Sequence, residues 1–363
     1  MGKKALARLQ RLCSLGIGSE MLVPDLMREI AGPVPFRHGI FYWVERNSEI
    51  SNTYTTLPSD FMDLFYKEFY RRERQTAFIK TIGSFDYWPQ AASVLRLDDH
   101  LRVDRPTFLR SDFYNLLWRE WGMCDPLIVC VRSLGQIRAV LHLYRAPGEA
   151  RFGWDDIKFL ESIVGFVAHG MKRVNFGADA FAGGEDSALL VADPDGTVRY
   201  ASVEAQRLLR MALNPVLSPS ANWRVVGEVL PELAWLGHAL TATARGSIGQ
   251  PPPVLRRRTP WAEFVLRAYW LGATDGVEQT RQIGITIERR VPRALALWRR
   301  IEDLPLTARE RELCLLLARN ISSKDIADAM GLAASTVVTH QRGIYSKLNV
   351  HGRAGLLATL ESE

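Results

Sequence analysis

The sequence predicts an α+β protein of several domains, in which two blocks built on antiparallel sheets precede an all-α block. Three observations support this fold class. The chain has 363 residues, which is more than one ordinary domain contains. Alternating polar and apolar segments, separated by turn residues, recur through the first two blocks. Residues 305–363 instead have helical periodicity, with clear signals for helix starts and stops.

The composition is that of a folded globular protein, with 47% hydrophobic and 24% charged residues. No apolar run is long enough to span a bilayer. The basic N-terminus carries Arg8 and Arg11 between its apolar positions, which predicts an amphipathic helix rather than a secretory signal. We therefore expect a cytoplasmic protein without a membrane partner. The net charge of +6 permits nucleic-acid binding but does not argue for it alone.

The cysteine and histidine patterns do not indicate a metal or redox site. None of the four cysteines belongs to a CxxC pair, so reduced thiols are expected at Cys13, Cys124, Cys130 and Cys314. The seven histidines are scattered, and we do not expect His38, His142 or His169 to bind a metal or haem. No nucleophile–base motif or phosphate loop occurs either. The sequence therefore predicts no enzyme activity, no metal and no cofactor.

Changes in composition divide the chain. A small, Gly-rich polar stretch separates the first two blocks, and the Asp-Pro-Asp-Gly hairpin signal opens the second. A helix that begins near Pro292 connects the second block to the third. The predicted divisions are a first domain at 1–176, a linker at 177–187, a second domain at 188–290, a linker helix at 291–304 and a third domain at 305–363.

The third block contains four predicted helices. Thr307 and Glu310 have the spacing of a capping box at the start of the first. The second begins at Ser322 or Ser323 and ends at Gly331. The third helix, Ala334 to Leu348, has an apolar face formed by Val337, Gln341, Ile344 and Leu348 and a small polar face on the opposite side. A fourth begins at Gly352, so the block has the pattern of a helix-turn-helix unit, although a bundle used only for packing has a similar pattern.

The charges of this block are sorted rather than abundant. It holds seven Lys/Arg and six Asp/Glu from Leu304 to Glu363, a balance of 7 − 6 = +1. No acidic residue lies between Asp328 and Glu361, whereas Arg342, Lys347 and Arg353 do. A surface without carboxylates suits a polyanion, so this region is the predicted contact with double-stranded DNA.

The segments "LTARERE", "KDIA", "TVVTH" and "KLNVHGR" in this block resemble the LuxR-type DNA-binding domain. The resemblance implies that the helix Ala334 to Leu348 enters the major groove as part of a homodimer, and that the final helix supports dimerisation. It also implies that base edges are contacted by Val338, Thr339 and Arg342. Phosphates would be contacted by Lys324, Ser335, Thr336 and Lys347. The chain departs from the family's usual residues at Asn320, where Gly is common, at Ala333, where Ser or Thr caps the helix, and at Val338, where Lys is common.

The first block resembles a GAF-type sensor domain. The resemblance rests on two alternating strands around Gly135 and the long helix after "RFGWDD". It implies an antiparallel sheet with helices and a small-molecule pocket. The second block resembles a PAS domain on the segments "ALLVADPDGTVRYAS", "EFVLRAYWL" and "QIGITIERR".

Aromatic residues are concentrated in the first block, where 14 of the chain's 35 lie between Phe36 and Trp88. On an α-helix from Phe61 to Tyr70, the apolar side chains would cover about 240° of the circumference, more than one sheet-facing stripe needs. The surplus must contact a ligand, a second subunit or a covering loop, although aromatic residues are also ordinary core residues. The predicted wall of an effector pocket consists of Trp43, Tyr54, Tyr66, Trp88 and Trp118, which suits a small hydrophobic or aromatic effector.

The apolar positions of the helix after Trp154 have spacings of 3, 4, 3, 4 and 3 at Ile157, Leu160, Val164, Val167, Met171 and Val174. This seam either pairs two subunits or packs on the helix's own sheet. The sequence as a whole predicts a homodimeric, sequence-specific DNA-binding transcriptional regulator, controlled by an effector in the first block, with RNA polymerase as a further partner. The alternative is a ligand-independent regulator whose first two blocks serve dimerisation or protein–protein signalling.

Overall fold

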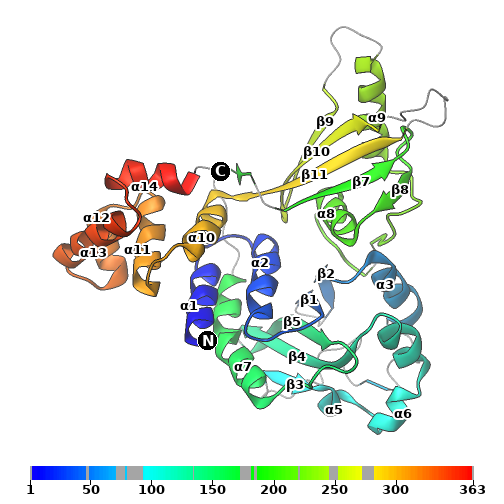
Figure 1. Cartoon of the computed structure of the whole chain (residues 1–363). Coiled ribbons are helices and arrows are strands. Elements are labelled where there is room, and N and C mark those ends of the chain that lie inside the picture. Colours follow the sequence, from blue (N-terminus) through cyan, green and yellow to red (C-terminus); the bar gives the residue numbers. More distant parts are fainter. Residues whose placement is uncertain are drawn as a thin grey trace.

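The computed structural model covers the whole chain and contains two antiparallel sheets and a C-terminal group of helices (Figure 1). The residues that it describes are 2–45, 49–70, 78–79, 93–133, 135–171, 181–183, 186–219, 221–244, 252–271 and 282–361. No helix within these ranges is both long and apolar enough to cross a membrane. The mixed α/β fold predicted from the sequence is confirmed at this level.

The first sheet has five strands in the order β2-β1-β5-β4-β3. Its strands are β1 (His38–Val44), β2 (Ile50–Thr55), β3 (Val94–Arg96), β4 (Cys124–Ser133) and β5 (Gln136–Arg145). The associated helices are α1 (Gly2–Cys13), α2 (Ser19–Ala31), α3 (Ser59–Leu64), η1 (Phe65–Phe69), α5 (Leu97–His100), α6 (Arg105–Leu109), η3 (Phe113–Arg119) and α7 (Trp154–Gly170).

The second sheet follows the path β8-β7-β11-β10-β9, with β6 paired to β11 off this path. Its strands are β6 (Phe181–Ala182), β7 (Ser187–Ala192), β8 (Val198–Ala201), β9 (Val254–Thr259), β10 (Ala262–Trp270) and β11 (Ile283–Pro292). Two helices lie between β8 and β9, namely α8 (Val203–Leu213) and α9 (Pro231–Ala244).

The two sheets share one topology. When the main strands of each sheet are numbered in chain order, both follow the order 2-1-5-4-3. Tight hairpins close at Gly135 and Gly196, where φ is +77° and +90°, values that glycine adopts without steric cost. Both turns were predicted from the sequence and are confirmed.

Helix α7 buries one face within its own chain. Ile157, Leu160 and Val167 are almost inaccessible, and the helix packs on β4 on one side and on α1 on the other (Figure 1). The predicted seam therefore serves intramolecular packing, because two neighbours in the same chain already cover its central positions. Val164 and Met171 are half-buried, and Val174 lies outside the described residues.

The aromatic segment from Phe61 to Tyr70 is not one α-helix. It is an α-helix to Leu64 and then a π-helix, closed by a hydrogen bond of 2.8 Å from the Tyr70 amide to the Phe65 carbonyl. A π-turn fits more residues into each turn, so the angles computed for a regular α-helix do not apply. The aromatic side chains divide instead between the interior of the first block and the second block, where Tyr66 stacks on Trp223.

The predicted linker at 177–187 is partly anchored in the parts that the structure describes. Phe181 and Ala182 pair with the end of β11, and Asp186 forms ion pairs described below. Strand β11 then leads without a loop into α10 (Arg293–Asp303). The last helices are α11 (Ala308–Ala318), α12 (Ser323–Met330), α13 (Ala334–Lys347) and α14 (Gly352–Glu361).

Candidate nucleic-acid interface and internal cavity

The ends of α11 and α12 form as their sequences predict. The Thr307 hydroxyl accepts from the Glu310 amide at 3.3 Å, and the Glu310 carboxylate accepts from the Thr307 amide at 2.8 Å, which completes the capping box. Ser322 caps α12, and Gly331 ends it in the left-handed conformation with φ of +61°. The turn that aims α13 is therefore set by local side-chain and backbone chemistry.

Helix α13 has two distinct faces. Val337 and Ile344 are fully buried against the neighbouring helices. On the outer side Val338 is 38% exposed, and Thr339 and Arg342 are exposed as well. These are the three residues for which the sequence predicts base contacts, and the fold places them together on one open face of the helix.

The predicted phosphate contacts differ in their availability. Ser335 and Lys324 are exposed, and Thr336 is half-buried. The side chains of Lys324 and Arg342 form no hydrogen bond or ion pair with any other residue that the structure describes. Lys347 is different, because its ammonium group lies 2.7 and 2.8 Å from the two carboxylate oxygens of Glu310.

The ion pair of Lys347 has a structural role. Although burial favours its neutral form, the pKa of Glu310 is lowered by the hydrogen bond from Lys347 and by the bonds from Thr307. One carboxylate thereby closes the start of α11 and holds the C-terminal end of α13. Lys347 is therefore not a free cation of the kind that the sequence suggested.

Two family departures have visible consequences. Asn320 adopts the left-handed conformation with φ of +62°, which asparagine tolerates better than most residues. Ala333 occupies the N-cap position of α13 and offers no side-chain acceptor to the first turn. Helix α13 thus begins with one stabilising hydrogen bond fewer than α11 or α12.

A cavity of about 40 Å³ lies inside the first block. One wall is the face of the sheet that carries Ile40, Ile128 and His142, which are neighbours in the strand register. The opposite wall comes from aromatic side chains of the covering helices, including Phe61 and Phe113. The cavity has room for about three water-sized groups.

His142 is one of two histidines that line the cavity, together with His100. Its Nδ1 atom lies 3.1 Å from the Tyr144 hydroxyl, and its Nε2 atom is buried without a hydrogen-bond partner among the described residues. Burial lowers the pKa of His142 to about 3, with a further contribution from nearby His100. The imidazole is therefore neutral at physiological pH.

The structure does not bring the five predicted pocket residues together. Trp118 lines the cavity, and Tyr66 contacts the neighbouring Phe65 and Tyr70. Trp43 and Tyr54 lie on the opposite face of the sheet, because side chains alternate along β1 and Tyr54 pairs with Phe41. Trp88 lies outside the described residues.

Trp43 and Tyr54 face the second block instead. The Trp43 ring packs edge-on against Trp261 at a centroid distance of 5.5 Å, and its Nε1 atom donates to the Ser19 hydroxyl at 2.9 Å. The Tyr54 hydroxyl accepts a hydrogen bond from Arg207 of α8. The aromatic density of the first block therefore serves its contact with the second block as well as the cavity.

A buried carboxylate on α10 connects the two ends of the chain. The side chain of Glu302 is inaccessible to solvent and accepts two hydrogen bonds from Arg11 of α1, at 2.6 and 2.9 Å. Arg8 of α1 and Arg311 of α11 each place a nitrogen 3.8 Å from the same carboxylate. Glu302 thus touches the N-terminal helix and the first helix of the C-terminal block.

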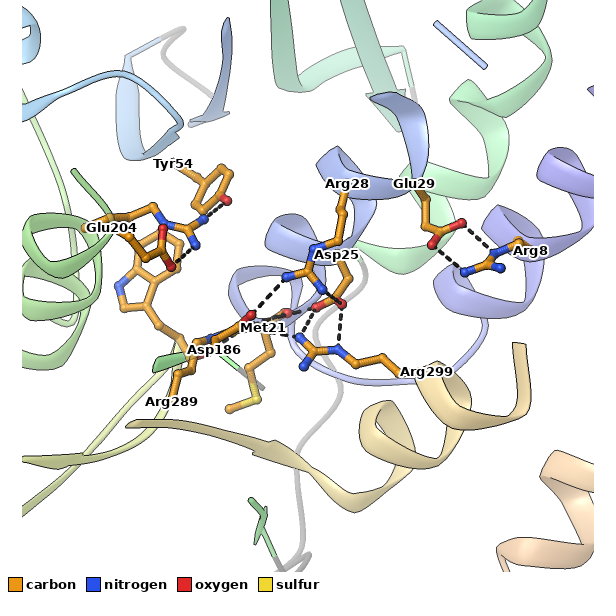
Figure 2. Close-up of polar contacts among 12 residues, drawn as sticks. Arg8, Met21, Asp25, Arg28, Glu29, Tyr54, Asp186, Glu204, Arg289 and Arg299 are labelled. Atoms are coloured by element: carbon orange, nitrogen blue, oxygen red, sulfur yellow. Dashed lines mark hydrogen bonds and ion pairs between the residues drawn. The ribbon is translucent and has the colours of Figure 1, made fainter. Parts of the chain in front are cut away.

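A second ionic cluster joins α2, β11, α10 and Asp186, which lies just before β7 (Figure 2). Arg299 of α10 donates to both carboxylate oxygens of Asp25 on α2, at 2.8 and 2.9 Å. Asp186 accepts from Arg289 of β11 at 2.9 Å, from Arg28 at 3.1 Å and from Arg299 at 3.3 Å. Burial opposes the ionised form of Asp186, but the three arginines outweigh it and hold its pKa well below the ordinary value.

Arg289 completes this cluster. The side chain is fully buried, and it donates to the backbone carbonyls of Met21 at 3.1 Å and of Trp261 at 3.2 Å (Figure 2). Its contacts therefore reach α2 of the first block and the start of β10 in the second. A change in the relative position of the two sheets would leave buried charges without partners. The cluster therefore holds the two sheets in this arrangement.

Sequence reasoning missed His142, Glu302 and the Asp25–Arg299 pair as functional candidates. Strand alternation could have grouped His142 with Ile40 and Tyr42 once the strand pairing was known. No sequence signal marks the ion pairs, since their members are separated by hundreds of residues.

Comparisons with known proteins place the C-terminal block. Residues 304–359 match the family described as bacterial regulatory proteins, luxR family. Over 53 residues the chain is 38% identical to the transcriptional regulatory protein MctR of Rhizobium johnstonii. The aligned part is 15% of this chain and 25% of MctR, so the chain spans a quarter of the length of that curated relative.

Two solved structures resemble the chain at low TM-scores. One is the GAF domain/HD domain protein from Geobacter sulfurreducens, at 14% identity and a TM-score of 0.28, covering 42% of this chain and 92% of that one. The other is the sensor region of a sensor histidine kinase, at 15% identity and a TM-score of 0.20, covering 70% of this chain and 84% of that one. TM-scores this low do not assign the front blocks.

The family match covers α12, α13 and the left-handed turn at Gly331 between them, and the outer face of α13 is exposed. Residues 304–359 are a helix-turn-helix domain of the luxR family of bacterial regulatory proteins.

Proposed function

We propose that the chain is a sequence-specific DNA-binding transcriptional regulator that acts as a homodimer. The observation that carries the proposal is the outer face of α13, where Val338, Thr339 and Arg342 lie together, exposed, on a helix of a luxR-family domain. An exposed helix of this kind fits the major groove of B-DNA. Arg342 has no competing ion pair among the described residues and can donate two hydrogen bonds to a guanine.

The phosphate contacts follow from the same placement. Lys324, Ser335 and Thr336 border the outer face of α13 and can position it on the DNA backbone. We assign Lys347 a smaller share, because Glu310 already neutralises its charge.

The front blocks supply the control. The proposed division is a GAF-like domain at 1–176, a linker at 177–187, a PAS-like domain at 188–290, a linker helix at 291–304 and the DNA-binding domain at 305–363. The shared strand order of the two sheets supports two related sensor modules. The aromatic cavity of the first sheet supports an effector that is small and hydrophobic or aromatic.

Helix α10 is the proposed route between effector and DNA. It bonds to α1 through Glu302 and to α2 through Arg299, while Arg300 donates to the carbonyl of Leu360 at the end of α14. A shift of α1 or α2 on effector binding would therefore move the helix that family resemblance links to dimerisation. Such a shift requires that the effector bind one arrangement more tightly than the other.

Selection from random DNA followed by footprinting tests the core of the proposal. The full-length chain is expected to enrich two half-sites in an inverted repeat and to protect both. The variant Arg342→Ala should weaken binding and relax the enrichment at one base pair in each half-site, whereas Ser162→Ala, at an exposed position on α7, should leave the enrichment unchanged. Absence of any enriched sequence, with the domain shown to be folded by circular dichroism, would contradict sequence-specific binding.

A further inference from the structure

We propose that the cavity of the first sheet binds a small uncharged molecule whose oxygen accepts a hydrogen bond from Nε2–H of His142. This deepens the proposed function, on which it rests, because it names the chemical class of the effector. The geometry that points to it is a buried, unmatched polar atom in a cavity whose other walls are mostly apolar.

The first step is the position of His142. It pairs with Ile40 on β1 and with Ile128 on β4, and all three line the cavity. The ring also makes an edge contact with Tyr42, at a centroid distance of 5.3 Å. His142 thus lies on the central strand of the cavity wall, and its Nε2 atom is inaccessible to solvent in this position.

The second step is the proton count. His142 is neutral and has one N–H, and the Tyr144 hydroxyl has no partner among the described residues other than Nδ1 of His142. If the imidazole donated from Nδ1, both the Tyr144 proton and the Nε2 lone pair would remain unmatched. If Tyr144 donates to Nδ1, only one group, Nε2–H, is left unmatched. The second arrangement is preferred because buried unmatched groups are costly, and it leaves a donor that faces the cavity.

The third step is the charge of the cavity wall. The lining includes two histidines, His100 and His142, but no lysine, arginine, aspartate or glutamate. The low pKa of His142 keeps that ring uncharged near neutral pH. A charged ligand would lose its hydration without meeting an opposite charge, so the site selects against ions. An acceptor oxygen on an otherwise apolar skeleton matches both the Nε2–H donor of His142 and the aromatic walls.

Matched probes test the proposal on the full-length chain. Acetone and isobutene are small enough for the cavity and have the same shape, but only the ketone accepts a hydrogen bond. Isothermal titration calorimetry should give a ratio of olefin Kd to ketone Kd that is about tenfold larger in the unaltered chain than in His142→Phe. The same exchange at exposed His169 on α7 should leave the ratio unchanged.

Two results of these titrations would contradict the proposed ligand class. An equal ratio in the chain and in His142→Phe, or tighter binding of acetate than of the ketone in competition, would overturn the inference. If His142→Phe does not fold, histidine 15N–1H spectra of the unaltered chain replace it. The Nε2 proton of His142 should shift with acetone and not with the olefin, and a proton on Nδ1 instead would overturn the inference.

Gel-shift measurements on the same preparations separate this inference from the proposed function. DNA binding without ketone selectivity overturns the ligand assignment and leaves the DNA-binding proposal intact. Ketone selectivity without DNA binding contradicts the DNA-binding proposal and leaves the ligand assignment intact.

Discussion

Glu302 and Arg11 are 291 positions apart in the chain, yet they form a bidentate ion pair with N–O distances of 2.6 and 2.9 Å. The carboxylate is inaccessible to solvent and lies on the helix between the second sheet and the DNA-binding domain. The N-terminal helix is therefore part of the same packed unit as the linker helix. Any movement of α1 relative to the first sheet must either carry Glu302 along or break a buried charge pair.

The variant Glu302→Gln is expected to lower the free energy of unfolding by about 3 kcal/mol, because Arg11 is left buried without its anionic partner. Asp303→Asn is the matched control, since the neighbouring carboxylate is 83% exposed, and it should change stability by less than about 0.5 kcal/mol. Urea unfolding followed by tryptophan fluorescence measures both. Equal effects of the two exchanges would show that Glu302 does not hold α1 to α10.

Arg342→Ala is expected to weaken binding to the selected operator by about 1–3 kcal/mol and to relax the preference at one base pair in each half-site. Val338→Lys should instead change which sequences are selected, because an ammonium group replaces an apolar side chain on the same exposed face. Fluorescence anisotropy with single-base operator variants measures both. Uniform weakening on all sequences by Arg342→Ala would indicate a phosphate contact instead.

Lys324 and Lys347 are expected to differ in their effect on the salt dependence of DNA binding. Lys324→Ala should reduce the slope of log K against log salt by about one, because each phosphate contact releases counterions. Lys347→Ala should reduce it by less, since Glu310 already binds the ammonium group, but should lower the thermal midpoint of the domain. Equal slopes for the two variants would show that Lys347 leaves Glu310 when DNA binds.

Ala333→Ser is expected to stabilise the domain by about 1 kcal/mol. The backbone at Ala333, with φ of −70° and ψ of 145°, closely resembles that of the two functioning caps, Thr307 and Ser322. A serine hydroxyl there can accept from the first turn of α13 without any change of backbone. Ala334→Ser, one residue into the helix, cannot cap and should be neutral or slightly destabilising. Thermal unfolding of both variants is the measurement.

His142 is expected to make the stability of the chain depend on pH. Its pKa is 6.5 ordinarily and about 3 in the folded chain, so below pH 6.5 the unfolded chain binds a proton that the folded chain does not. This contribution to stability is therefore full above pH 6.5 and is lost as the pH falls toward 3. Between pH 7.5 and 5.5, the free energy of unfolding of the unaltered chain should fall by about 1.4 kcal/mol through His142. The variant His142→Phe should not show this contribution. Urea unfolding at the two pH values measures it, and a constant difference between the proteins would contradict a neutral, buried ring.

The features that sequence alone predicted are those that depend on neighbours within one or two helical turns. The capping box of Thr307 and Glu310, the end of α12 at Gly331 and the inward face of Val337 and Ile344 all follow from spacings of three or four residues. The hairpins at Gly135 and Gly196 follow from turn chemistry of the same range.

Prediction failed where a side chain had a choice of partner. Both Trp43 and Trp118 are large and aromatic, yet Trp118 of η3 lines the cavity and Trp43 packs on Trp261, because alternation along β1 turns Trp43 to the face of the sheet away from the cavity. The periodicity around Ile157 is equally compatible with a second subunit and with the chain's own helices. Only the packing of α1 on α7 resolved that choice.

The amino-acid sequence by itself determined the helix-turn-helix unit, since caps, helix faces and the missing acids are properties of a continuous segment. The tertiary structure decided which charges meet, which sheet face encloses the cavity and which cation of α13 is already neutralised. These depend on atoms brought together from distant segments, as when Lys347 meets Glu310, Asp25 meets Arg299 or Glu302 meets Arg11. Burial makes the Asp25–Arg299 and Glu302–Arg11 pairs costly to break, because a charge removed from water cannot exchange its partner for solvent.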